Sequence, residues 1–571
     1  MENPSPPRHH RLAWLALATF GTLLLLPGTR YLLKTQMRMQ TLTYSTTTDF
    51  SQERAAAARL ASDYPVQLAL ATRLPSDSNG TGYDPLHPLE QSKARNRRIA
   101  ALEQQFPNNP SVYANLMRYM SLGEMRLMRD PKPADTSTAA NVQVYVPSEE
   151  TQEMFLAAAQ KGAALDPDNA YFPMMETVGL LAAHRDREAM DALKIAGRCS
   201  QWKEYFQDDL DGQNRLRSAT YGEQGAVQHL YTAASLLFPQ YASLRSAAQV
   251  AARLAAEEER DGNTAEGIEI RHALMRCGGL MRSQGAFQIT VLVGVAITTL
   301  GTVNPGGVSE ADNQSLTSYP VKSDDAEKLR AERLTKYCAY LETLGQTQEA
   351  AWAKTEAGAG AQARAIGMEA MSLSVFDGMN FFQLGVAWLV NNSLLSGVLI
   401  LLVLGAAANL AGHIRPRKGL KLGRFLYAVA ILGGIALWQW QASRVCSSPF
   451  VEIQNLFRDV SSSNNYDGEA NAAAIQRLAA GLGLLIPQLL VGLIAVLSLF
   501  QKVPVSTGLG RGLRGIAIPM AAVLFLVYGV SLLPTASLEA SINTDITRTA
   551  NNEPHRFAEL TGKVWPGDPQ P

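Results

Sequence analysis

Residues 516–534 read IAIPMAAVLFLVYGVSLLP and contain no Asp, Glu, Lys or Arg. Three similar runs precede this one, at Ser393–Gly412, Phe425–Ala442 and Leu478–Phe500. Each run is about as long as the roughly 20 residues that a helix needs to cross a bilayer. The mean hydropathy of the whole chain is near zero because a large polar segment dilutes the four runs. The sequence therefore predicts an integral membrane protein with a four-helix transmembrane domain at residues 393–534.

Another apolar run lies near the N-terminus. Residues 12–27 follow a basic segment, as in a secretory signal, and apolar residues resume after Arg30. The small residues that mark a signal-peptide cleavage site do not follow the run. We expect an uncleaved signal anchor at residues 12–33 behind a cytoplasmic segment at residues 1–11. A cleaved signal peptide is the alternative.

Two loops between the apolar runs, residues 414–424 and 501–515, contain basic residues and no acidic ones. Because Lys and Arg are retained in the cytoplasm, both loops are expected there. This pattern predicts five spans in the cytoplasmic membrane, a cytoplasmic N-terminus and an extracytoplasmic tail at residues 535–571. The basic side chains either contact anionic lipid headgroups or serve only to set the orientation. The candidates for lipid contact are Arg415, Arg417, Lys418, Lys421, Arg511 and Arg514.

The polar segment at residues 34–380 has the apolar spacing of helices. In Thr151–Leu165, for example, apolar residues recur at every third or fourth position. We expect an extracytoplasmic helical domain here, followed by an interfacial segment at residues 381–392. The uncharged stretch at residues 286–303 contains Gln288 and four threonines, so we expect it to be a buried core helix rather than a span. The best strand candidate is the short stretch Asn141–Val146.

Prolines interrupt the helical pattern in the manner of helical hairpins. Lys161–Tyr171 reads KGAALDPDNAY, so a helix is expected to end near Leu165 and the next to begin after Asn169. Arg98–Val112 and Tyr231–Ala242 have the same design.

Leu254–Ala273 contains Gly262 followed by Ala265, and Tyr340–Trp352 contains Gly345 followed by Ala350. We expect these small residues to let antiparallel helices approach closely. These stretches resemble tetratricopeptide repeats, whose pattern has Gly in the first helix, Ala in the second and Pro near the repeat end. Ala163–Ala170 is the closest match. The resemblance implies a helical-hairpin array that binds protein segments on its concave face. An irregular helical domain is the alternative.

The short motifs in the sequence do not predict a reaction. Residues 510–515 fit GxGxxG but lack the flanking strand and the acid of a dinucleotide site, so we expect a flexible loop. His184–Asp186 resembles the start of a kinase catalytic loop without its companion motifs, and we expect a charged hairpin loop. Glu269 and His272 have the spacing of half a di-metal site, and we expect a surface pair. We therefore expect no catalytic, cofactor or metal site.

The 51 basic and 51 acidic residues balance, so the net charge gives no reason to expect a nucleic-acid partner. The cysteines are far apart and form no CxxC motif. All of them fall in segments that we expect outside the cytoplasm, which leaves two alternatives open: one or two disulfides, or buried free thiols. The cysteines are Cys199, Cys277, Cys338 and Cys446.

The sequence as a whole predicts an all-α, polytopic membrane protein with a large soluble helical-hairpin domain. The expected function is that of a non-enzymatic, membrane-tethered interaction or assembly module, whose partners are membrane lipid and a protein bound by the helical domain. Two alternatives stay open. One is a subunit of a membrane transport or export system. The other is a membrane enzyme for lipid-linked substrates that uses carboxylates such as Glu452, Asp459 or Asp467.

Overall fold

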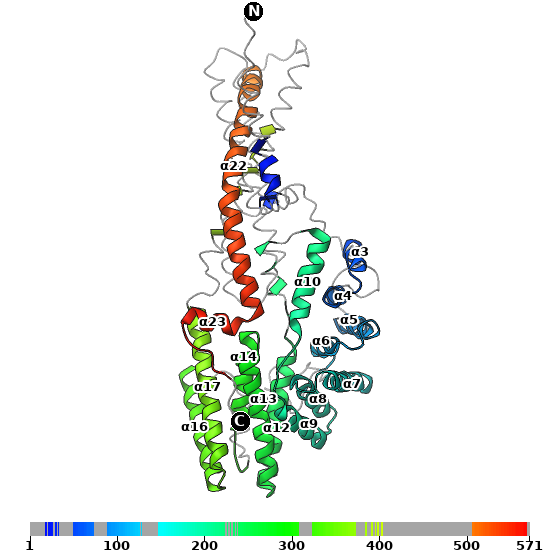
Figure 1. Ribbon diagram of the computed structural model, residues 1–571, viewed down its shortest axis with the longest axis vertical. Helices are drawn as coiled ribbons and strands as arrows, with labels where there is room; N and C mark the ends of the chain where they lie inside the picture. Colours follow the sequence, from blue (N-terminus) through cyan, green and yellow to red (C-terminus); the bar gives the residue numbers. More distant parts are fainter. Residues whose placement is uncertain are drawn as a thin grey trace, which may run out of the picture. The chain divides into compact units, whose positions relative to one another are not determined.

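The structure is a computed structural model whose described residues are helices, turns and short linkers (Figure 1). It describes residues 50–73, 88–125, 147–222, 238–307, 323–372 and 505–567, together with Leu127 and scattered residues within 18–33, 225–236 and 383–402. The all-α prediction is confirmed for this part of the chain. The strand candidate at residues 141–146 lies outside it.

The chain divides into two compact units. We call the first the apolar unit, which comprises Met1–Thr47, Gly225–Val227 and Phe376–Thr544. We call the second the helical unit, which comprises Thr48–Gln224, Gln228–Val375 and Asp545–Pro571. The helical unit therefore includes the C-terminal residues as well as the polar segment.

The helical unit consists of helices joined mostly by short turns. In chain order these are α3 (Ser51–Arg59), α4 (Tyr64–Arg73), α5 (Pro88–Ala101), the short 3-10 helix η1 (Leu102–Gln104), α6 (Pro110–Met120), α7 (Glu149–Leu165), α8 (Tyr171–Ala182), α9 (Asp186–Arg198), α10 (Phe206–Tyr221), α12 (Gln240–Arg260), α13 (Thr264–Gln284), α14 (Gln288–Gly301), α16 (Ser323–Thr343), α17 (Thr347–Ser372) and α23 (Glu553–Thr561). Sequence neighbours pack as antiparallel pairs, as short turns require, for example α8 with α9 and α12 with α13. Figure 1 shows α3 to α9 nearly end-on, one above the next, whereas α12, α13, α16 and α17 run lengthwise.

The turns of the hairpins follow local sequence signals. The break predicted at Pro167 is confirmed, because α7 ends at Leu165 and α8 begins at Tyr171. His184 lies in the turn between α8 and α9 with a positive φ of 56°, so the predicted charged hairpin loop is also confirmed. Pro110 is the first residue of α6. Proline has no backbone N–H, and at this position a helix does not use that N–H in a hydrogen bond.

The role predicted for Gly262 and Gly345 is wrong. Both lie in turns with positive φ, 93° and 73°, and a methyl group on either would meet no atom within 4 Å. They allow the chain to turn rather than two helices to approach. Close approach occurs instead at Gly197, where a Cβ atom would lie 2.6 Å from the Cα of Ala273, so α9 and α13 pack backbone to backbone.

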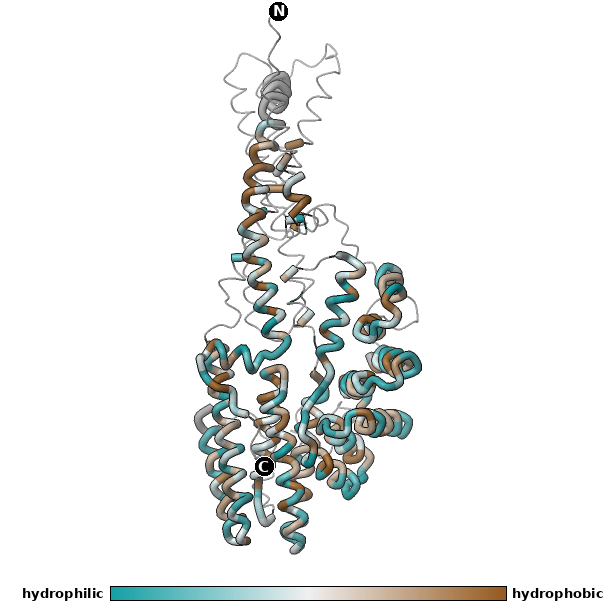
Figure 2. The backbone as a smooth tube through the Cα atoms, viewed as in Figure 1, coloured by the Kyte–Doolittle hydropathy of each residue, from teal (hydrophilic) through white to brown (hydrophobic). Residues whose placement is uncertain are grey.

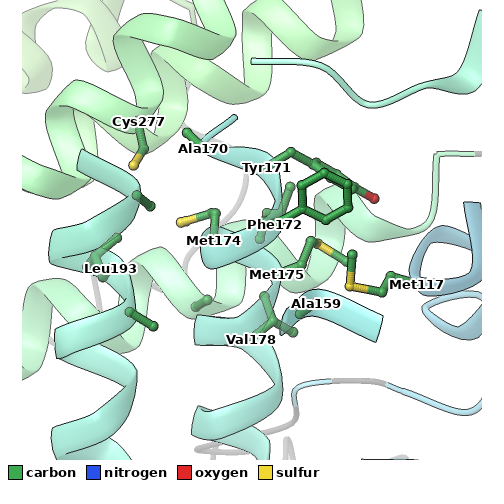
Figure 3. Packing of buried hydrophobic residues seen from close by; sticks show 14 of the residues in the cluster. Met117, Ala159, Ala170, Tyr171, Phe172, Met174, Met175, Val178, Leu193 and Cys277 are labelled. Atoms are coloured by element: carbon green, nitrogen blue, oxygen red, sulfur yellow. The ribbon is translucent and has the colours of Figure 1, made fainter. Parts of the chain in front are cut away.

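The hydrophobic core of the helical unit surrounds α8, nearly all of which is buried. Figure 3 shows its side chains among residues from α6, α7, α9 and α13. The labelled contributors are Met117, Ala159, Tyr171, Phe172, Met174, Met175, Val178, Leu193 and Cys277. Cys199, Cys277 and Cys338 are buried free thiols, so the free-thiol alternative holds for the cysteines that the structure describes.

Three buried ion pairs connect the helices of the helical unit. They are Arg118 with Asp209, Arg271 with Glu259 and Arg282 with Glu356, and all six side chains are at most 1% exposed. Arg271 also donates to the carbonyl oxygens of Gly301 (3.0 Å) and Val303 (2.6 Å), at the C-terminal end of α14. The Arg271–Glu259 pair is thus completed by hydrogen bonds to main-chain carbonyls, as buried charges require. The Nε and Nη1 atoms of Arg118, in contrast, have no hydrogen-bond partner among the described atoms.

The segment that we expected to be a core helix, residues 286–303, forms α14, which has 14 residues and contacts α12, α13 and α17. Its helix is shorter than a span requires. Gly294 and Gly278 let α14 and α13 pack closely, since a Cβ on either would lie 2.6 Å from the carbonyl oxygen of the other.

The C-terminal residues, which we expected to form a tail, are folded into the helical unit from Asp545 onward. The backbone N–H of Gln288 donates to the Glu553 carboxylate (2.7 Å), and the N–H of Glu553 donates to the carbonyl of Ala286 (2.9 Å). These two bonds join the start of α23 to the start of α14. Arg282 donates to the carbonyl of Pro566 (3.1 Å), which fixes the extended chain beyond α23.

The apolar unit contains most of α22 (Val505–Asn551). Val398 and Leu401 pack near Ala521, and the amide of Asn391 donates to the hydroxyl of Thr535 (2.9 Å). The earlier residue, Asn391, contacts the later part of α22, and Val398 and Leu401 contact its earlier part. The described residues of 383–402 therefore run antiparallel to α22.

One helix in the described part of the chain, α22 over Pro519–Asn551, is long and apolar enough to cross a membrane. Its apolar stretch is coloured brown in Figure 2. Of the other apolar runs predicted as spans, residues 425–442 and 478–500 lie outside the described residues, and residues 12–33 and 393–412 are described only in part. The prediction of several spans is therefore not supported by this part of the chain.

Two predictions about α22 are wrong. Residues 501–515, expected to be a loop, are helical from Val505, because each glycine costs only about 1 kcal/mol in a helix that its neighbours propagate. Pro534, expected to end the fourth run, lies inside the helix. The hydroxyls of Ser531 and Thr535 donate to backbone carbonyls beside it (2.7 and 2.8 Å), as polar side chains do where proline interrupts an apolar helix.

Removing one partner of a buried pair tests this packing. Glu356→Gln leaves the Arg282 guanidinium buried without a negative charge, which costs about 3 kcal/mol. The melting temperature of the full chain in mild detergent should fall clearly. Glu188→Gln, which alters the exposed pair with Arg185, should leave it nearly unchanged. Equal effects of the two substitutions would contradict the role given to the buried pair.

Candidate functional site

A pocket of about 330 Å³ lies in the helical unit where the linker between α9 and α10 meets the turn between α13 and α14. We call it the Glu204 pocket. Its lining combines two carboxylic acids, two amides, one lysine and two aromatic rings. These residues are Trp202, Lys203, Glu204, Tyr205, Gln207, Asp208, Gln284, Gly285 and Ala286.

The linker that forms one wall is fixed in an extended conformation by two amide side chains. The Asn169 amide donates to the carbonyl of Lys203 (3.0 Å), and the N–H of Lys203 donates back to the Asn169 side chain (2.9 Å). On the other side, Gln284 accepts from the N–H of Trp202 (2.8 Å) and donates to the carbonyl of Ser200 (3.0 Å). The wall is therefore rigid before any ligand arrives.

Tyr205 ends this wall with a left-handed backbone conformation, φ 57°. An aromatic residue adopts this conformation at a cost that its surroundings must offset. The Tyr205 hydroxyl donates to Asp166 (2.6 Å), and the Tyr205 carbonyl accepts from the Asn115 amide (3.2 Å). The turn at Tyr205 sends the chain into α10, which brings Asp208 to the pocket.

Glu204 is buried and its carboxylate is surrounded by donors. The hydroxyl of Tyr241 donates to it at 2.8 Å, the hydroxyl of Thr290 at 3.1 Å and the amide of Gln240 at 3.5 Å. Burial raises the pKa of Glu204 above its ordinary value, and the three hydrogen bonds oppose this shift. Glu204 therefore joins the linker between α9 and α10 to α12 and α14.

Two further groups in the pocket are suited to a polar ligand. Burial raises the pKa of Asp208 above its ordinary value, with a hydrogen bond from Ser111 opposing the shift. The indole N–H of Trp202 is buried and has no hydrogen-bond partner among the described atoms. The pocket thus combines a partly buried carboxyl group, Asp208, with the exposed Lys203 within one site. Such a site suits a segment that both donates and accepts hydrogen bonds.

A second pocket of about 330 Å³ lies in the apolar unit, between the residues near 383–391 and α22. Its polar groups are already bonded to one another, because Asn391 binds both Ser531 and Thr535. The other residues that line this pocket are mostly apolar, including Ala387, Val390, Pro534 and Leu538. This pocket has fewer polar groups to offer a ligand than the Glu204 pocket.

The described residues that line the two pockets are not among those predicted as sites from sequence. Arg511 and Arg514 lie within α22, and the remaining lipid-contact candidates lie outside the described residues. The carboxylate candidates Glu452, Asp459 and Asp467 lie outside them as well. The pocket residues were missed, although QWKEYF at Gln201–Phe206 is an unusual linker with three aromatic residues and neither Gly nor Pro.

Glu269 and His272 each pair with another helix. Glu269 accepts from Arg198 (2.9 Å), whereas the His272 ring lies 2.9 Å from the Glu349 carboxylate. In the described part of the chain, groups of three or more potential metal ligands are not found. The described neighbours of these two residues therefore act as ion-pair partners.

Comparison of the chain with known protein families, with curated proteins and with solved structures finds no match. The function is therefore argued from the residues of this chain alone.

The burial of Glu204 makes a pH-dependent prediction. A folded-state pKa raised above 4.5 means that the folded chain binds the proton more tightly than the unfolded chain. The free energy of unfolding then falls as the pH rises from about 4.5 to the folded-state pKa. Glu204→Gln, which stays neutral, should escape this loss.

The measurement is the melting temperature of the wild type and the variant between pH 4.5 and 8. The melting temperature of the variant relative to that of the wild type should increase by at least about 2 °C as the pH rises. This difference should level off above the folded-state pKa. Glu188→Gln serves as an exposed control. A gap that does not widen with pH would show that Glu204 does not titrate as proposed.

Proposed function

We propose that this chain is a non-enzymatic, membrane-tethered interaction module. Its helical unit binds a segment of a protein partner in the Glu204 pocket, outside the cytoplasm. The observation that supports this most directly is the construction of the pocket. Its wall is fixed by Asn169 and Gln284, while Lys203 and Asp208 offer polar groups to a ligand.

The helical hairpins support the same proposal. Stacked helical pairs expose extended surfaces on which a partner segment can lie. The resemblance to tetratricopeptide repeats in the sequence is consistent with this use, although the chain belongs to no family shown by the comparisons. A segment with a basic residue would complement Asp208, and its carbonyl groups would accept from Lys203.

The continuity of the chain supports a membrane tether for the helical unit. Residues 48–375 and 545–571 belong to one compact unit, so they must lie on the same side of a membrane. The chain between them must therefore cross the membrane an even number of times. The four apolar runs within residues 393–534 satisfy this condition, and they support a multi-pass arrangement in the cytoplasmic membrane.

The length of α22 supports the same arrangement. Arg514 precedes Thr535 by about 20 helical residues, which span roughly 30 Å, the thickness of the hydrocarbon core. With Arg511 and Arg514 near cytoplasmic headgroups, as the positive-inside rule favours, the helical unit lies outside the cytoplasm. The six basic residues identified in the sequence are then the proposed contacts with lipid.

Charge reversal at the pocket tests the proposal. The tagged full chain is purified from native membranes in gentle detergent, and co-purifying proteins are quantified by mass spectrometry. We expect one protein at near-stoichiometric amount with the wild type, and a loss of at least about tenfold with Lys203→Glu. The matched reversal Glu188→Lys, at an exposed site in the first turn of α9, should retain it.

Two outcomes would contradict the proposal. A partner retained equally by both variants would not bind at the Glu204 pocket. A solitary protein that carries only bound lipid would favour a lipid-handling carrier or enzyme instead.

A further inference from the structure

The chain beyond α23 binds to the helical unit in the way that a peptide ligand binds to a receptor. Residues 563–567 are not helical and follow Gly562, whose positive φ of 65° ends α23. They lie on what we call the docking surface, which is formed by Arg282 of α13, Gln362, Ile366, Glu369 and Ala370 of α17, and Phe557 of α23.

Backbone recognition comes from two side chains. The Gln362 amide donates to the carbonyl of Val564 (3.1 Å). Arg282 donates to the carbonyls of Pro566 (3.1 Å) and Gly567 (3.3 Å). Because these bonds are made to main-chain atoms, any extended segment of suitable shape can form them.

Side-chain recognition comes from one aromatic residue and one charge. Trp565 packs against the cluster that contains Ile366, Ala370 and Phe557. Lys563 pairs with Glu369. Val564, between them, points to solvent, with 82% of its surface exposed. Over Lys563–Trp565, contacting and exposed side chains alternate as in an extended peptide, and the next residue, Pro566, is buried.

Arg282 is oriented for this task by a partner outside the segment. Its guanidinium is held by Glu356 (3.0 and 3.2 Å), and it is fully buried with the segment in place. Its Nη1 atom then reaches the peptide carbonyls. A buried, oriented guanidinium loses little conformational freedom when it binds a carbonyl, which favours a recognition role.

We propose that the docking surface is a peptide-binding site for extended segments that carry a Trp-Pro pair, and that residues 563–567 occupy it in competition with such a segment of a partner protein. The site is separate from the Glu204 pocket and does not depend on it. The C-terminal segment acts as a tethered competitor, because its effective concentration is in the millimolar range for a short connection.

The test uses the full chain in mild detergent and a fluorescein-labelled peptide of residues 562–571, with binding followed by fluorescence anisotropy. Trp565→Ala removes the aromatic anchor of the tethered segment and should open the surface, so this chain should bind the peptide in a saturable way. The wild type should bind it at least about tenfold more weakly. Val564→Ala, the matched control, should behave like the wild type because its side chain is exposed.

A second variant with a weakened C-terminal segment controls for the possibility that Trp565→Ala fails to fold. Lys563→Glu reverses the exposed contact with Glu369 and should also bind the labelled peptide more tightly than the wild type does. Adding Gln362→Ala to the Trp565→Ala chain should weaken binding several-fold, since the bond to the peptide carbonyl is lost.

Three results would overturn the proposal. The peptide could fail to bind either opened chain. It could bind the wild type and the opened chains equally, which would place it elsewhere. A labelled peptide with alanine in place of the tryptophan could bind as well as the original, which would remove the aromatic anchor from the recognition.

Discussion

The buried pair between Arg282 and Glu356 is the interaction on which the rest of this account depends. It joins α13 to α17, and the same guanidinium binds the carbonyls of Pro566 and Gly567, 284 and 285 residues away in the sequence. Removing two charges from water is costly, and the cost is offset only when every partner is present. The C-terminal segment therefore supplies carbonyl groups that satisfy this buried guanidinium.

The sequence predicted the features that depend on local chemistry. The turn at Pro167 and the charged loop at His184 were found because proline, glycine and polar residues act on their own neighbours. The continuation of α22 through Pro534 was missed because tertiary and side-chain contacts outweigh a local breaker. The role of Gly262 was mispredicted for a similar reason. Composition does not distinguish this turn residue from Gly197, which allows close helix packing against Ala273.

The Glu204 pocket could not be predicted, because each of its constraints connects distant parts of the chain. Asn169 fixes the linker across 34 residues and Gln284 across 82. The donors around Glu204 come from α12 and α14. What the sequence does offer is the stretch at Gln201–Phe206, rich in aromatic and charged residues, in a place where a short polar turn would suffice. Such a linker between two helices is a reasonable signal of a site, but it does not identify the ligand.

In the proposed arrangement, the helical unit lies on one side of a membrane and is connected to it at both ends by the apolar runs. The measurement that tests this most directly is labelling by a membrane-impermeant maleimide in intact cells, in a chain with Cys446→Ala. The account predicts that Leu344→Cys in the helical unit and Val564→Cys near the C-terminus are both labelled, whereas Lys418→Cys is protected until the cells are opened. Labelling of Leu344→Cys with protection of Val564→Cys would contradict it, because the two would then lie on opposite sides of the membrane.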